Sequence, residues 1–138
     1  MIFYFLPMIL FLGLVTSYTD IIYGKIKNKH VLIGMIYAII VNIALIIYYK
    51  FIGEINQGYV YELITNAFFS VAAGFILWNL GIWSAADGKL FIAFSLLIPL
   101  DVYEFGYEKF FPGMIFLTNI FICSLIVIIL WEYLLWTH

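Results

Sequence analysis

The sequence is poor in charge and in cysteine, and it contains no arginine. Of its 138 residues, 10% are charged, and the formal net charge is -2. Soluble domains are about 25% charged, so a water-soluble globular domain is excluded. The small net charge also excludes binding to nucleic acid by neutralisation of its phosphates. The single cysteine, Cys123, excludes an intramolecular disulfide framework and a four-thiolate metal site.

Apolar residues dominate what is present. Hydrophobic residues make up 67% of the chain and aromatic residues 21%, and the mean hydropathy is +1.14. Disordered chains have few aromatic residues and high net charge, so disorder is excluded as well. Long apolar runs such as 43–49 and 120–130 show no alternation of polar and apolar residues, which argues against a membrane β-barrel. The composition therefore predicts an all-α, polytopic transmembrane helix bundle.

Charged residues divide the chain into apolar stretches whose lengths can be compared with a bilayer. A hydrocarbon core of about 30 Å needs roughly 20 residues of helix. Four uncharged stretches meet this length, and a fifth, 90–100, meets it if its helix begins near Asp87 and Lys89 extends to the interface. We predict one membrane domain, 1–138, with about five spans: 1–19, 31–50, 60–83, 87–103 and 112–136.

The first stretch could instead be a cleaved signal peptide. Such a peptide carries a positively charged start and a small-residue cleavage site. Met1–Phe5 has no basic residue, so a retained helix is favoured.

The six basic residues, all lysines, predict the orientation. With five spans, Lys25, Lys27, Lys29 and Lys89 lie on one side of the membrane. The other side holds two lysines and most of the acidic residues: Lys50, Lys109, Glu54, Glu62, Asp101, Glu104 and Glu108. Lysine and arginine are enriched in cytoplasmic loops. We therefore expect the N-terminus outside and the four-lysine side in the cytoplasm of a multi-pass cell-membrane protein.

Two aspartates fall at the predicted cytoplasmic ends of the spans. Asp20 ends the first predicted helix and Asp87 opens the fourth. An acidic residue at the edge of a membrane is costly unless it faces a polar cavity or a partner. Two carboxylates held close together share a proton, so that one can activate water while the other protonates a peptide carbonyl. The alternative is that each aspartate only marks a helix end in the headgroup layer.

The sequences around the two aspartates resemble the type IV prepilin peptidases and their archaeal branch, the preflagellin peptidases. The first reads Asp20-Ile-Ile-Tyr-Gly-Lys-Ile26-Lys-Asn28, similar to a family signature with Ile and Asn six and eight residues after an Asp; Lys27 replaces the usual Pro. The second reads Ser84-Ala-Ala-Asp87-Gly-Lys89-Leu90, similar to Gly-x-Gly-Asp-x-Lys-Leu; Ser84 and Ala86 replace the glycines. The apolar run from Phe91 to Pro99 resembles the archaeal branch.

This resemblance implies a membrane-embedded aspartyl endopeptidase. The family removes the short basic leader of pilin-like or archaellin-like precursors at the cytoplasmic face of the membrane. Its catalytic pair would correspond to Asp20 and Asp87, and its chemistry needs neither a metal nor a cofactor. The expected partners are a precursor protein and the lipid bilayer, and homo-oligomerisation is left open.

Two further residues are candidates for supporting roles. Lys89 could favour the ionised form of Asp87 or hold a substrate carbonyl, or it could simply extend to the lipid headgroups. Asn28 could hold the connection near Asp20, although capping of the second helix is favoured. The cluster Lys25, Lys27, Lys29 and His30 is expected to contact anionic lipid.

A function of a different class is the alternative. The chain could be a small non-enzymatic membrane protein, either an ion or proton carrier or an assembly subunit. Transporters often show paired halves with ionisable groups near the bilayer midplane. Here the acidic residues stand at helix ends and no half-repeat is visible, which favours the peptidase.

Overall fold

Five helices, joined by short connections, make up the computed structural model of the chain, which describes residues 1–53, 57–103, 106 and 108–136. The helices are α1 (Ile2–Tyr23), α2 (Asn28–Ile52), α3 (Gln57–Asn79), α4 (Ala85–Leu97) and α5 (Gly113–Trp136), with a single 3-10 turn, η1 (Leu100–Val102), after α4. No strand occurs in this part of the chain. The predicted all-α class is confirmed. Glu54 and Glu104, which the sequence predicts on the outer side of the membrane, lie outside the described residues.

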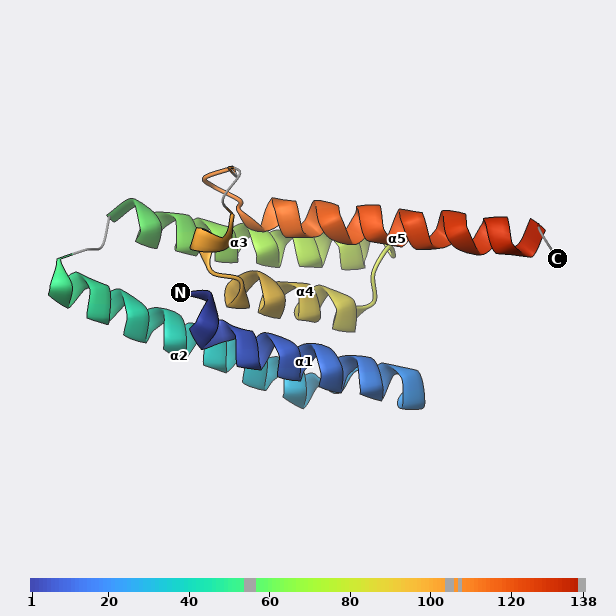
Figure 1. Cartoon of the computed structure of the whole chain (residues 1–138), viewed down its shortest axis with the longest axis horizontal. Helices are drawn as coiled ribbons and strands as arrows, with labels where there is room; N and C mark the ends of the chain where they lie inside the picture. The colour runs from blue at the N-terminus through green and yellow to red at the C-terminus, as the bar shows by residue number, and fades with distance from the viewer. Residues whose placement is uncertain (54–56, 104–105, 107, 137–138) are drawn as a thin grey trace.

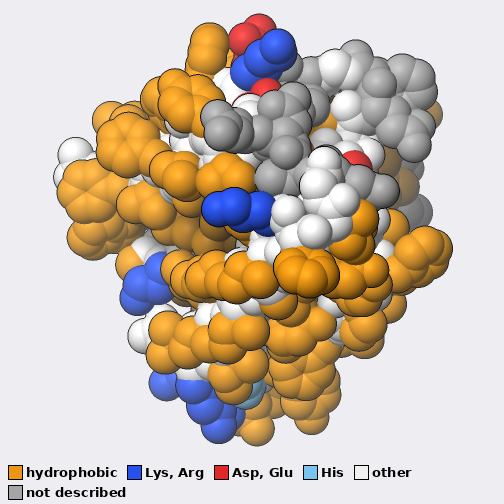
Figure 2. Space-filling view, turned by 90° about the vertical axis from the view of Figure 1, so that its left-hand side faces the viewer, with side chains coloured by type: hydrophobic (Ala, Val, Ile, Leu, Met, Phe, Trp, Pro, Cys, Tyr) orange, Lys and Arg blue, Asp and Glu red, His pale blue; other side chains and the backbone are white. Residues whose placement is uncertain are grey.

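Four of the helices are long and apolar enough to cross a membrane: α1, α2, α3 and α5. Successive helices run in opposite directions (Figure 1). Large apolar side chains are exposed along all of them. On the face shown in Figure 2, hydrophobic side chains cover most of the surface, and charged side chains occur only in small separate groups. A protein of this kind buries its outer surface in lipid, and the chain is a helical membrane protein.

The fourth predicted span, 87–103, differs most from the structure. Helix α4 has 13 residues, or about 20 Å at 1.5 Å per residue, which is short of the bilayer core. It ends before Pro99, and the single turn η1 extends the segment to Val102. A proline cannot donate the backbone hydrogen bond that would continue the helix, and this accounts for the break.

The early end of α4 is stabilised by asparagines from the two flanking helices. The last carbonyls of a helix have no partner within it. Asn42 of α2 donates to the carbonyl oxygen of Leu96 at 3.1 Å, and Asn66 of α3 donates to that of Ser95 at 3.1 Å. The Asn66 Oδ1 also accepts from the backbone N–H of Gly113 at 2.7 Å. One buried side chain therefore completes the end of α4 and the start of α5.

Helix α4 lies between α2 and α3 at the centre of the bundle (Figure 1). A buried apolar cluster joins α1, α2 and α4 and contains Phe5, Leu12, Val31, Ala38, Ala93 and Leu97. On the other side, α4 meets α3 backbone to backbone. A Cβ placed on Gly88 would lie 2.9 Å from the Gly74 carbonyl oxygen, closer than packed atoms approach. Only glycines allow this contact, and it fixes the depth of α4 against α3.

Candidate functional site

Figure 1 shows the C-terminal ends of α1 and α3 and the N-terminal ends of α2 and α4 at one end of the bundle. This end, which we call the aspartate end, carries all four of the predicted site residues: Asp20, Asn28, Asp87 and Lys89. At the opposite end, the N-terminal ammonium of Met1 pairs with Asp101 at 2.9 Å. The grouping expected from the alternation of the helices is therefore present in the structure.

Asp20 lies in the last turn of α1 and is exposed. The helix runs four residues further than the predicted span 1–19, because the chain first leaves helical geometry at Gly24. There φ is 60°, and the Gly24 N–H donates to the Asp20 carbonyl at 2.8 Å. Glycine adopts this left-handed conformation without steric cost. The Asp20 side chain is thus presented at the surface, one turn before the chain reverses.

Asp87 is also exposed, and its carboxylate is oriented by Ser84. Ser84 caps α4: its backbone N–H donates to Asp87 Oδ2 at 2.9 Å, and its hydroxyl donates to the same oxygen at 2.7 Å. The Asp87 N–H donates to the Ser84 hydroxyl at 3.2 Å. This reciprocal arrangement is a capping box. Both bonds to the carboxylate use Oδ2, which leaves Oδ1 available to bind water.

Lys89 and Asn28 are brought together across two helices. The Lys89 ammonium donates to Asn28 Oδ1 at 3.3 Å. The prediction that Asn28 caps α2 is wrong. The cap position is Lys27, no side chain bonds the first turn, and Asn28 is the first helical residue. Its amide instead ties the start of α2 to α4 near the two aspartates.

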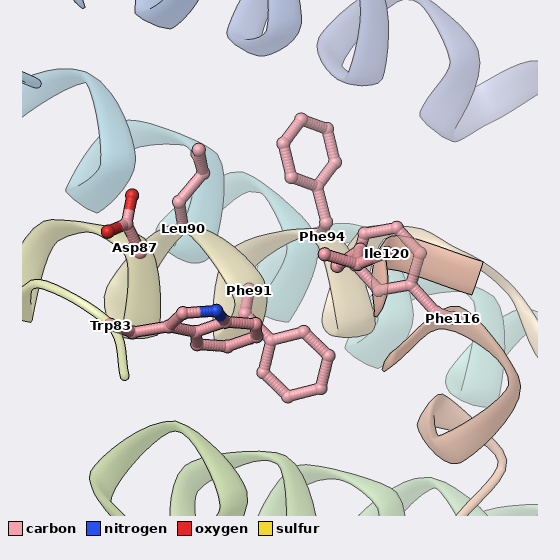
Figure 3. A pocket seen from close by; sticks show the side chains of 7 residues that line it. All are labelled: Trp83, Asp87, Leu90, Phe91, Phe94, Phe116 and Ile120. Atoms are coloured by element: carbon pink, nitrogen blue, oxygen red, sulfur yellow. The ribbon is translucent and has the colours of Figure 1, made fainter. Parts of the chain in front are cut away.

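An apolar groove begins at Asp87 and runs between α4 and α5 (Figure 3). We call it the α4–α5 groove. It has a volume of about 310 Å³ and is lined by Trp83, Asp87, Leu90, Phe91, Phe94, Phe116 and Ile120. Asp87 is its one charged lining residue and lies at one end of the row of side chains (Figure 3). The rings of Phe91 and Phe116 stack with centroids 5.7 Å apart, which joins the two walls.

Sequence reasoning missed this groove. The sequence pattern assigned no binding role to Trp83, Phe91, Phe94 or Phe116. A signal was present on one wall, because Asp87, Leu90 or Phe91, and Phe94 follow the three- and four-residue spacing that places side chains on one helix face. The other wall comes from α5 and is assembled only by the fold.

The aspartate end has the parts needed for acid–base chemistry on a chain that lies in or along the membrane. It has two exposed carboxylates, a carboxylate oxygen open to water, a lysine, and an apolar groove leading away from one carboxylate. In the described part of the chain, no group of three His, Cys, Asp or Glu side chains could hold a metal ion. Comparisons with family models, curated proteins and solved structures find no match for this chain.

Proposed function

We propose that this protein is a membrane aspartyl endopeptidase that removes the leader peptide of a pilin-like or archaellin-like precursor at the cytoplasmic face of the cell membrane. The observation that carries the proposal is the position of Asp87. It stands at the mouth of an apolar groove, at the same end of the bundle as Asp20. The resemblance of both aspartate segments to the prepilin peptidases supports the same assignment.

The geometry suggests how such a substrate would bind. A precursor of this class has a basic leader followed by an apolar helix. We place the apolar segment against the α4–α5 groove, whose walls are aromatic and aliphatic side chains. Its junction with the leader then lies beside Asp87, where the groove opens to the membrane surface.

Cleavage needs one carboxylate to take a proton from water and another group to donate a proton to the peptide carbonyl. We assign these roles to Asp20 and Asp87 together, because both carboxylates are exposed at the same end of the bundle. Ser84 fixes Asp87 through Oδ2, which leaves Oδ1 available for the reacting water. Lys89 is held by Asn28, and we assign it a supporting role.

The test is to co-express the chain with a pilin-type precursor and follow leader removal on a gel. Asp20→Asn and Asp87→Asn should each abolish processing while the variants still insert into the membrane. Asparagine keeps an oxygen that can accept from Ser84, so the fold of the cap is retained. Asp101→Asn, which removes a carboxylate at the opposite end, is the matched control and should process normally. Normal processing by either of the first two variants would refute the peptidase.

One observation favours the non-enzymatic alternative. The bonds of the Asp87 carboxylate complete the cap of α4, which is by itself a sufficient structural role. A proton carrier would move protons across liposomes in a manner that depends on Asp20 or Asp87 and would leave precursors uncut. An assembly subunit would do neither. Proton flux and precursor cleavage measured on the same variants therefore separate the three functions.

A further inference from the structure

The outer surface of α4 at the aspartate end carries two grooves with Lys89 between them. The first lies against α2, has a volume of about 470 Å³, and is lined by Asn28, Lys29, Val31, Leu32, Met35 and Lys89. The second lies against α3, has a volume of about 390 Å³, and is lined by Val71, Gly74, Phe75, Trp78, Ala85, Gly88, Lys89 and Ile92. Lys89 is the residue that lines both grooves.

The grooves are apolar along their length and positively charged at one end. Apart from Asn28 and the lysines, their lining side chains are aliphatic or aromatic. The cations are Lys29 and Lys89, and neither makes an ion pair with a carboxylate of the described residues. Lys27, by contrast, lies over the ring of Tyr23 at 4.8 Å from its centroid, and it lines neither groove.

We propose that this surface is a binding site for one membrane phospholipid with an anionic head group. The phosphate lies between the ammonium groups of Lys29 and Lys89. The Asn28 amide nitrogen, in the same groove, donates a hydrogen bond to it. One acyl chain lies in the groove against α2 and the other in the groove against α3, on either side of Ile92. The inference does not depend on the peptidase activity.

Three features favour a phospholipid over a soluble phosphate compound. The two grooves share one lysine, Lys89, which matches one head group carrying two chains. Both grooves follow membrane-spanning helices, so acyl chains in them remain continuous with the bilayer. The lysines stand where the spans end, which is the depth of the headgroup layer. A phosphate without chains would leave the apolar walls uncovered.

The site differs from the diffuse lipid contact expected from the sequence. That expectation rested on the closely spaced residues Lys25, Lys27, Lys29 and His30. In the structure, the cations that share a groove come from two different helices, and Lys89, not Lys25 or Lys27, accompanies Lys29. A site built by α2 and α4 together predicts that the lipid binds at a fixed ratio to the protein. It also predicts that binding depends on Lys29 and Lys89 more than on Lys25 or Lys27.

Trp78 lines the groove against α3 and provides the readout. The purified chain, in neutral-lipid nanodiscs, would be titrated with brominated phosphatidylglycerol or brominated phosphatidylcholine. Bromine in an acyl chain quenches tryptophan fluorescence at short range. We expect saturable quenching by the anionic lipid at about one per protein and weaker quenching by the zwitterionic lipid. Trp78→Phe should remove most of the difference, which places the chain in this groove.

The lysine variants distinguish a defined site from general attraction. Lys29→Gln and Lys89→Gln should each weaken binding of the anionic lipid about fivefold, the effect of one lysine near a charged surface. Lys25→Gln removes an equal charge from the same end but outside both grooves, and it should change little. Equal losses in all three variants would overturn the proposal in favour of diffuse attraction. Displacement by millimolar inorganic phosphate would overturn it in favour of a simple anion site.

The test of lipid binding does not depend on the proposed peptidase activity. The same titration on Asp87→Asn should give unchanged binding, because Asp87 lines neither groove. Lipid binding without precursor cleavage would refute the peptidase alone. Cleavage without selective lipid binding would refute the lipid site alone.

Discussion

Ser84 shows how one side chain connects helix formation with the chemistry of the site. It replaces a glycine of the motif that the segment resembles, and its hydroxyl makes hydrogen bonds that a glycine could not make. It begins α4 and holds the Asp87 carboxylate by two donors, its N–H and its hydroxyl. A glycine could supply only the first of these. The helix N-terminus and the carboxylate orientation therefore depend on the same residue.

Replacement of this hydroxyl has a measurable cost. Ser84→Ala removes the acceptor for the Asp87 N–H and one donor to the carboxylate, and we expect it to lower the free energy of unfolding by about 1 kcal/mol. Unfolding in mixed micelles, followed by circular dichroism, would measure the change. Ser124→Ala is the control, because among the described residues the Ser124 hydroxyl bonds just the Ile120 carbonyl of its own helix. If both variants were equally stable, the capping box would contribute nothing.

The exposure of the two aspartates and their placement at one end could be predicted from the sequence, since charges at span ends must face water. The partner of Asn28 could not. An asparagine just before an apolar run satisfies the rule for a helix cap, and only the approach of α4 shows that its amide meets Lys89 instead. The position of a side chain along the sequence does not determine which other helix it faces.

At the scale of the helices, the spans follow from the cost of charge in lipid, and four of the predicted ranges match the structure to within a few residues. The way in which α4 ends could not be predicted from the sequence pattern. Pro99 indicates that the helix must stop, but an interrupted helix inside a membrane also needs partners for its last carbonyls. Asn42 and Asn66 supply them from α2 and α3. Such partners are far apart in sequence, so local reasoning cannot identify them.

The contact between α3 and α4 at Gly74 and Gly88 makes a second prediction. Gly88→Ala places a methyl group 2.9 Å from the Gly74 carbonyl oxygen. The atom that must yield is backbone, so α4 shifts away from α3, at a cost of about 1–3 kcal/mol. Unfolding in mixed micelles measures the loss. Because Gly88 follows Asp87 directly, leader removal should fall as well.

Gly13→Ala is the matched control for this substitution. It is also a helical glycine, but its added methyl group would meet only the end of the Phe94 ring at 3.9 Å, an ordinary contact distance. We expect its stability to be unchanged or slightly raised, since alanine is the better helix former. If Gly13→Ala destabilised the protein as much as Gly88→Ala, the glycine contact would have no special importance.

For the molecule as a whole, the two ends differ in kind. The end with the chain's N-terminus is closed by the pair between Met1 and Asp101 and by the Tyr37 hydroxyl, which donates to the Tyr4 carbonyl at 2.7 Å. The aspartate end is open, with its carboxylates exposed and its grooves facing outward. Helix α5 extends past the other helices on this side (Figure 1), and its residues from Phe121 to Trp136 are exposed. The grooves that begin at this end are therefore accessible to an apolar substrate or lipid.

Which side of the membrane this end faces decides whether the proposed substrate can reach it. Four lysines against two predict the cytoplasm, where the leader of a precursor is found. In a Cys123→Ser background, Lys109→Cys should react with a membrane-impermeant maleimide added to intact cells. Lys29→Cys should react only after the membrane is opened. The reverse pattern would place both aspartates outside and would contradict the peptidase, since the carboxylates would then face the side from which the leader is absent.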